Sequence, residues 1–313
     1  MNNKPHIYIL TGPTGAGKTT LAVEIARLWN TEIISADSMQ IYRQMCIGTA
    51  RPTTEELKEI PCRLTGMVNI DEKYDLARFI SEADANIKRI SNEGHPPFIV
   101  GGTGLYIKGL LEGVFPSAPR DDKLRKILKL RIKEQGLEEL HKELAEVDPE
   151  SAERIPPGDR QRIVRALEVY RTTGKPISIH HRENRRSEPR YPFTLVVLTR
   201  DRDELYKRIE QRVDKMFSGG LVDEVQSILD AGYSSNLHPL KALGYREMIR
   251  ALNGECSMEE AVTEMKKSTR RFAKRQLTWF RGMPGAQWLN ATGLNQKQLI
   301  ASALDIYEKN CGE

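Results

Sequence analysis

The sequence is poor in the features that mark secreted, membrane-spanning and metal-stabilised proteins. Its 313 residues include four cysteines, widely spaced and without a CxxC pair, which argues against a disulfide framework and a structural metal site. Its apolar runs are all shorter than the roughly 18 residues that a membrane span requires. The first ten residues carry one lysine and one short apolar run, which is not the pattern of a signal peptide. We therefore expect a soluble, cytoplasmic protein with reduced thiols.

The chain also has little net charge and no internal repeat or low-complexity tract. Lysine and arginine (48) exceed aspartate and glutamate (43) by five, so the distribution of charge is more informative than its total. Apolar residues make up 39% of the chain, which suffices for a sizeable core, and the length favours two domains.

The stretch from Ile7 to Leu28 is the most informative part of the chain. Residues 7–10 form a short apolar run that predicts a buried strand, and the apolar residues after Thr19 recur at helical spacing. Between them, GPTGAGKT fits the pattern G-x-x-x-x-G-K-[ST] at every fixed position. A strand before this Walker A motif and a helix after it are the context that the motif requires. We therefore predict that the chain binds a diphosphate or a triphosphate, as nucleotide- and ATP-binding P-loops do.

Each residue type in this P-loop has a chemical reason. The glycines allow backbone N–H groups to turn toward a phosphate, at the positive end of the following helix. Lys18 would reach a phosphate oxygen, and the Thr19 hydroxyl would hold Mg²⁺. The predicted diphosphate-binding residues are Gly12, Thr14, Gly15, Ala16, Gly17, Lys18 and Thr19.

Strand and helix patterns alternate after the P-loop. Residues 32–35, 98–100 and 193–198 predict three more buried strands, and Asp75 caps a helix between the first two. This alternation favours a parallel sheet with right-handed crossovers. Beyond the last of these strands, the patterns predict helices alone.

A charged, helical segment interrupts this α/β pattern. We predict a P-loop NTPase-like parallel sheet with flanking helices in residues 1–119 and 191–313, and a mainly helical insertion domain in residues 120–190. Within the insertion, Asp159 caps a helix that carries Ile163, Val164 and Leu167 on one face.

The insertion is rich in arginine. Between Arg154 and Arg190, ten basic residues face four acidic ones. Arginine forks suit phosphate oxygens, and crowding of like charges is costly unless a polyanion neutralises it. The excess predicts contact with nucleic acid, and RNA is favoured because helix-turn-helix and zinc-finger patterns are missing. The charged run from Lys123 to Lys133 is explained equally well as a solvated helix face.

The acidic strand end of a Walker B motif is also missing. Residues 98–100 end in glycines, and the strand-end acid near the P-loop is Asp37, in a position where open α/β sheets bind ligands. The residues alone leave three roles open for Asp37: a magnesium ligand through water, a helix cap, or a general base. Without a Walker B motif, nucleotide hydrolysis is not expected.

An ordered set of motifs resembles the tRNA dimethylallyltransferases, also called tRNA isopentenyltransferases. The motifs are GPTGAGKT from Gly12, DSMQIY from Asp37, IGTARP from Ile47, GGTGLYIKGLLEG from Gly101, DRQRIVRALEVYRTTGKPIS from Asp159, KALGYRE from Lys241 and TRRFAKRQLTWFRG from Thr269. They cover nearly the whole chain and are far more specific than a Walker A motif alone. Family members often have serine in place of Ala16 or Gly15, and the C-terminal zinc finger of the eukaryotic members has no counterpart here, so the resemblance is to the bacterial type.

The resemblance implies transfer of a dimethylallyl group from dimethylallyl diphosphate to N6 of the adenosine 3′-adjacent to the anticodon, with Mg²⁺ as cofactor. It implies that Asp37 is the general base, that Thr103 lies beside the reacting amine, and that Arg212, or else Arg208, binds the diphosphate. The target base would leave the anticodon stack. The positions implied to contact the tRNA anticodon stem-loop are Asp37, Ser38, Met39, Gln40, Arg125, Gln161, Arg162, Ile163, Val164 and Arg165. A monomer without membrane contact is expected.

Three other functions fit parts of the sequence. An adenylate isopentenyltransferase, which acts on free AMP or ADP, would not need the basic insertion. A P-loop small-molecule kinase would need ATP as phosphate donor. A non-catalytic RNA-binding P-loop protein would make Asp37 dispensable.

Overall fold

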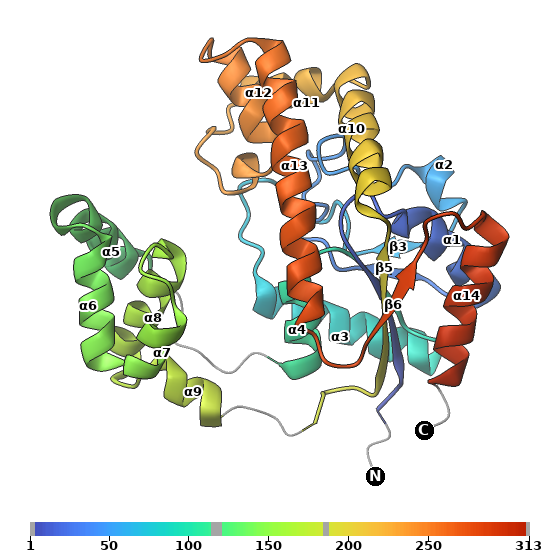
Figure 1. Ribbon diagram of the computed structural model, residues 1–313, viewed down its shortest axis with the longest axis horizontal. Helices are drawn as coiled ribbons and strands as arrows, with labels where there is room; N and C mark the ends of the chain where they lie inside the picture. Colours follow the sequence, from blue (N-terminus) through green and yellow to red (C-terminus); the bar gives the residue numbers. More distant parts are fainter. Residues whose placement is uncertain (1–3, 114–120, 184–187, 311–313) are drawn as a thin grey trace. The chain divides into compact units, whose positions relative to one another are not determined.

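The computed structural model describes residues 4–113, 121–183 and 188–310, which form two compact units (Figure 1). One unit combines Met1–Leu111 with Arg190–Glu313, and the other is Glu112–Pro189. Arg120, the first residue of the predicted insertion, and two of its basic residues, Arg185 and Arg186, lie outside the described residues.

The first unit is built on a six-stranded sheet in which every strand pairs in parallel. The strands are β1 (Ile7–Thr11), β2 (Ile33–Ser35), β3 (Cys62–Arg63), β4 (Phe98–Val100), β5 (Phe193–Thr199) and β6 (Ala286–Asn290). Their order is β3-β2-β4-β1-β5-β6, so β1 lies in the middle and all carboxyl ends meet at one edge, where ligands bind in such sheets. The predicted α/β fold is confirmed.

The prediction of helices alone after β5 is wrong, because β6 follows and forms one edge of the sheet. β3, which forms the other edge, was not predicted either. β6 shows an edge-strand pattern in which Leu289 is the one buried residue, and β3 has two residues. Neither strand has the continuous apolar run that marks the buried strands β1 and β5.

Helices cover both faces of the sheet because strand side chains alternate between them. Ile7 and Ile9 point into the core on one face, whereas Leu10 points into the core on the other. On the Leu10 face, α1 (Lys18–Leu28) and α14 (Gln296–Lys309) pack side by side (Figure 1). The remaining helices of this unit are α2 (Thr54–Leu57), α3 (Leu76–Asn92), α4 (Gly104–Glu112), α10 (Arg202–Ser218), α11 (Leu221–Asp230), η1 (Pro239–Lys241), α12 (Tyr245–Leu252) and α13 (Met258–Arg281).

Several helix starts follow the sequence signals. Asp75 caps α3 through a 3.0 Å hydrogen bond from the backbone N–H of Arg78, and Ser257 and Glu260 form the capping box of α13. Such caps satisfy N–H groups that have no partner within the helix. Within the described parts of the chain, no helix is both long and apolar enough to cross a membrane.

The second unit is helical. Its helices are α5 (Asp122–Gln135), α6 (Leu137–Val147), α7 (Pro149–Arg154), α8 (Arg160–Thr173) and α9 (Ile177–Glu183). Asp159 caps α8, whose Ile163 and Leu167 join Leu128 and Leu140 in a core of the unit's own. This separate core explains why the segment forms a compact unit by itself.

Candidate active site

The P-loop joins β1 to α1 in a conformation that only glycine permits at two positions. At Gly12, φ is 140°, and a Cβ atom would lie 2.1 Å from the carbonyl oxygen of Leu198 in β5. Gly17 has a φ of 101° and precedes the first turn of α1. The loop therefore packs tightly against the sheet and presents the N-terminal end of a helix, which attracts anions.

Lys18 lies across this loop. Its ammonium group donates hydrogen bonds to the carbonyl oxygens of Gly12 and Pro13, both at 2.9 Å. Burial, with the nearby positive charge of Arg212, lowers the pKa of Lys18 to about 7, and the carboxylate of Asp37 opposes this shift. The protonation of Lys18 is therefore sensitive to any anion that enters the site.

Asp37 follows β2 at the same edge of the sheet. Its Oδ1 accepts hydrogen bonds from the backbone N–H groups of Met39 at 2.9 Å and Gln40 at 3.3 Å. These bonds fix the carboxylate in the turn, as in an Asx turn, and its charge partly opposes the lowering of the pKa that burial causes at both Lys18 and Arg212. The structure thus brings the carboxylate of Asp37 close to two cations. Its hydrogen bonds to the backbone of Met39 and Gln40 are compatible with a further role as a general base or a magnesium ligand.

Thr103 connects the end of β4 to this turn. Its hydroxyl accepts a hydrogen bond from the backbone N–H of Ser38 at 3.0 Å and donates one to the Ser38 hydroxyl at 3.3 Å. At Gly101, a Cβ atom would lie 2.2 Å from the carbonyl oxygen of Ala36. The ends of β2 and β4 therefore touch, which places Thr103 beside the segment that begins at Asp37.

The two candidate arginines of α10 bond to different segments of the chain. Arg212 donates to the carbonyl oxygen of Thr49 at 3.3 Å, and burial lowers its pKa while Asp37 opposes the shift. Arg208 donates to the carbonyl oxygen of Gly15 at 2.9 Å, and burial and the charge of Arg200 lower its pKa. Arg212 therefore belongs to the group around Asp37 and Lys18, whereas Arg208 braces the outside of the loop.

Two supporting residues escaped the sequence analysis. Arg200, directly after β5, donates to the carbonyl oxygen of Ala16 at 2.9 Å. Glu224 of α11 accepts hydrogen bonds from the backbone N–H groups of Cys46, Ile47 and Gly48 at 2.7–3.1 Å. These contacts hold the P-loop and the IGTARP segment in place. The sequence carries no signal for them, because a lone arginine or glutamate on a helix is usually a surface residue.

A third residue that escaped the analysis, Gln276, lies in the TRRFAKRQLTWFRG motif of α13. Its side-chain oxygen accepts a hydrogen bond from the backbone N–H of Thr14 at 2.9 Å, and its side-chain nitrogen donates to the carbonyl oxygen of Gly102 at 2.8 Å. Gln276 therefore links the P-loop to the turn that carries Thr103. The motif indicated that this part of α13 is functionally important, but nothing within it distinguishes Gln276 from its neighbours.

The residues of the helical unit that were expected to contact tRNA fall into distinct groups. Gln161 and Arg162 are exposed in the first turn of α8. Ile163 and Val164 are buried in the core of the unit, with 0% and 7% of their surfaces exposed. Their side chains therefore pack inside the unit, so a contact of these two residues with RNA would have to be made by the backbone.

Arg125 and Arg165 form an ion-pair cluster around Glu168, whose side chain is completely buried. Arg125 binds both carboxylate oxygens, at 2.7 and 2.8 Å, and Arg165 binds one of them at 2.6 Å. Burial acts to raise the pKa of Glu168, but the hydrogen bonds from the two arginines outweigh it and leave the pKa below its usual value. The charges of these arginines are therefore largely used inside the unit.

Thr19 lies in the first turn of α1, partly buried. In the described residues, no group of three or more histidine, cysteine, aspartate or glutamate side chains could hold a metal ion. Mg²⁺ keeps several water ligands and needs one or two protein groups beside phosphate oxygens. The Thr19 hydroxyl at a P-loop fits that requirement, whereas a metal site made of protein ligands alone does not.

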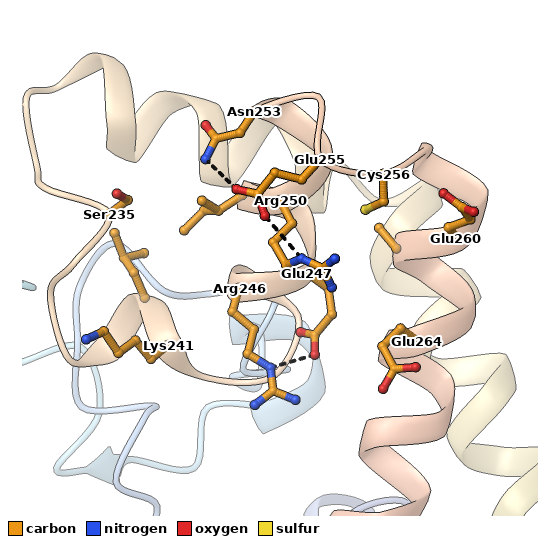
Figure 2. Close-up of a pocket in the computed structure, with 13 residues that line it drawn as sticks. Ser235, Lys241, Arg246, Glu247, Arg250, Asn253, Glu255, Cys256, Glu260 and Glu264 are labelled. Atoms are coloured by element: carbon orange, nitrogen blue, oxygen red, sulfur yellow. Dashed lines mark hydrogen bonds and ion pairs between the residues drawn. The ribbon is translucent and has the colours of Figure 1, made fainter. Parts of the chain in front are cut away.

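A separate cavity of about 740 Å³ lies among η1, α12 and the start of α13, away from the P-loop (Figure 2). Its charged side chains pair with one another: Arg246 with Glu247 at 2.7 Å, and Arg250 with Glu255 at 3.3 Å. None of the predicted site residues lines it. This cavity is therefore not the place where the P-loop, Asp37 and Thr103 meet.

Comparisons with known proteins identify the same family that the ordered motifs resemble. A family model described as "IPP transferase" matches residues 40–283, and one described as "Isopentenyl transferase" matches residues 5–64. A tRNA dimethylallyltransferase of Acetivibrio thermocellus is 45% identical over 96% of this chain and 97% of its own length. The corresponding protein of Pelotomaculum thermopropionicum is 44% identical over 97% of this chain and 96% of its own length.

Solved structures are similar over the same extent. A tRNA isopentenylpyrophosphate transferase from Bacillus halodurans superposes with a TM-score of 0.74 at 36% identity, covering 98% of this chain and 97% of that one. A eukaryotic dimethylallyltransferase acting on tRNA gives a TM-score of 0.83 at 28% identity, with coverage of 98% and 79%. Both helical and sheet-based units are therefore included in the likeness.

Proposed function

The chain belongs to the IPP transferase family of tRNA-modifying prenyltransferases, and we propose that it transfers a dimethylallyl group to N6 of the adenosine 3′-adjacent to the anticodon of tRNAs. The donor is dimethylallyl diphosphate, and diphosphate is released. The observation that carries this proposal is the meeting of Asp37 with Lys18 and Arg212 at the carboxyl edge of the sheet. A base and an anion site side by side are what this substitution requires.

In the proposed reaction, the bond between C1 of the dimethylallyl group and its diphosphate oxygen breaks, and its electron pair stays on the diphosphate. A new bond forms between C1 and N6 of the adenosine. The N6 proton passes to the carboxylate of Asp37, because an exocyclic amine is a weak nucleophile unless a base accepts its proton. Thr103, held beside Asp37 through Ser38, lies next to the amine.

The P-loop stabilises the departing diphosphate. Backbone N–H groups of Gly15, Ala16 and Gly17 surround it, and the cations of Lys18 and Arg212 bind its oxygens, where negative charge grows in the transition state. We propose Arg212 for this role because it faces Asp37, and Arg208 as its support behind the loop. The Thr19 hydroxyl would hold Mg²⁺, which supplies further neutralisation of the diphosphate when bound.

The helical unit, residues 120–190, is proposed to bind the anticodon stem-loop. Gln161 and Arg162 are exposed in the first turn of α8, where side chains and backbone N–H groups can reach phosphates. Ser38, Met39 and Gln40, which follow Asp37, are proposed to contact the target nucleotide. We expect the enzyme to act as a monomer in the cytoplasm.

The decisive experiment is mass spectrometry of tRNA nucleosides after incubation with dimethylallyl diphosphate and Mg²⁺. We expect adenosine to gain one dimethylallyl group in place of one hydrogen, in tRNA whose anticodon is followed by adenosine. A tRNA with guanosine at that position serves as the control. Product formed on free AMP or ADP would instead identify an adenylate isopentenyltransferase, and phosphate transfer from labelled ATP would identify a kinase.

A further inference from the structure

Gln276 occupies an unusual place for a helix side chain. It is 7% exposed, and the two ends of its amide group bond to two different loops: the side-chain oxygen to the Thr14 N–H of the P-loop, and the side-chain nitrogen to the Gly102 carbonyl after β4. The Thr14 group can only donate and the Gly102 group can only accept. The orientation of the amide is therefore fixed by its partners.

The amide group of Gln276 lies directly against the backbone at Gly102. A Cβ atom there would lie 2.6 Å from the Gln276 side-chain nitrogen and 3.8 Å from the Lys18 ammonium nitrogen. Three residues further along α13, the ring of Trp279 lies 2.2 Å from the position of a Cβ at Gly104. Two side chains of α13 that are three residues apart thus press against the turn from Gly101 to Gly104.

We propose that Gln276 is a positioning residue that sets the spacing between the diphosphate and the reacting amine. One bond holds the P-loop, which binds the leaving group, and the other holds the residue before Thr103, which lies beside the amine through Ser38. The proposal rests on the proposed function. Because transfer requires N6 and C1 to approach along the line of the breaking bond, a small change in this spacing affects the rate more than it affects binding.

Gln276→Leu removes both hydrogen bonds at similar size. We expect the single-turnover rate at saturating tRNA and dimethylallyl diphosphate to fall about 10- to 100-fold, as displacements of about 1 Å do. The affinities for the two substrates, measured separately, should change much less. Ser268→Ala is the matched control, because Ser268 is a buried polar residue of the same helix whose bonds go to Arg246 and Glu264, and it should leave the rate unchanged.

Gln276→Glu gives a second readout, which depends on pH and is taken only where the measured free energy of unfolding shows that the variant is folded at each pH. An ionised glutamate has no proton for the Gly102 carbonyl, but a protonated one donates as the amide does. Burial raises the pKa of a carboxyl group, so the ratio of variant to wild-type rate should rise as the pH falls from about 9 to about 6. Taking the ratio at each pH removes the pH dependence that the two proteins share.

The outcomes separate the inference from the function on which it rests. A wild-type protein that forms no prenylated tRNA would overturn both. An active wild type with an unimpaired Gln276→Leu variant, or a Gln276→Glu ratio that is flat with pH, would overturn the inference alone. A rate loss in Gln276→Leu that is fully explained by weaker tRNA binding would also overturn it, because Gln276 would then be an RNA contact.

Discussion

Binding of the diphosphate should be coupled to uptake of a proton by Lys18. In the free protein, burial and Arg212 hold the pKa of Lys18 at about 7. A diphosphate next to the ammonium group favours the charged form and raises that pKa. Above pH 7, a growing fraction of the free enzyme must therefore gain a proton before the P-loop can bind its ligand fully.

The size of the effect follows from that pKa. If the protonated form binds and the neutral form does not, the dissociation constant rises by roughly tenfold for each pH unit above 7, and it changes little between pH 6 and 7. Near pH 8, binding should take up about one proton. The stability of the free protein should change in the opposite direction to its affinity. Between about pH 7 and 10.5, Lys18 binds fewer protons in the folded protein than in the unfolded chain, so this group makes the free energy of unfolding rise with pH.

Titration calorimetry with dimethylallyl diphosphate, in buffers of different ionisation enthalpy, measures affinity and proton uptake together. Lys18→Met is the control: it should bind weakly, with an affinity that is flat between about pH 7 and 9, because it has no proton to gain. A wild-type affinity that is equally flat over this range would refute the assignment of Lys18 to the diphosphate.

Asp37→Asn should slow single-turnover prenylation by about 10²–10⁴-fold with little change in substrate affinities. A rate that excess Mg²⁺ partly restores would show instead that Asp37 is a metal ligand. An unchanged rate would show that Asp37 is only a helix cap. Arg162→Ala should weaken tRNA binding and lower the slope of log K against log salt by about one, without loss of stability. Arg165→Ala should instead cost about 1–3 kcal/mol in the free energy of unfolding, because buried Glu168 loses a partner. Lys18→Ala should abolish turnover, and added ATP should not accelerate the wild type; a strict requirement for ATP would contradict the role given to the P-loop.

The centre of the fold and the loops of the site were predictable because each has a strong local signal. Buried parallel strands are apolar runs, and β1, β4 and β5 begin at the predicted residues. The P-loop and the turn at Asp37 follow such strands, so the rule that parallel strands end at one edge brings them together. The partners Arg200, Glu224 and Gln276 were not predictable, since each meets its loop through a contact more than 170 residues away in the chain.

The arginine excess of the insertion shows what a count of charges leaves out. Pairing depends on helices that are distant in the sequence: Arg171 of α8 meets Glu143 of α6 at 2.5 Å, and Arg125 of α5 meets Glu168 of α8. Removing an arginine that binds a buried carboxylate destabilises a protein, because it leaves a charge that water cannot reach with one partner fewer. A single acid therefore engages two arginines, whose side chains keep 26% and 28% of their surfaces exposed. The side chain of Arg162 is 62% exposed and lies 3.5 Å from Asp159, so Arg162→Ala is the variant that we expect to separate RNA binding from folding.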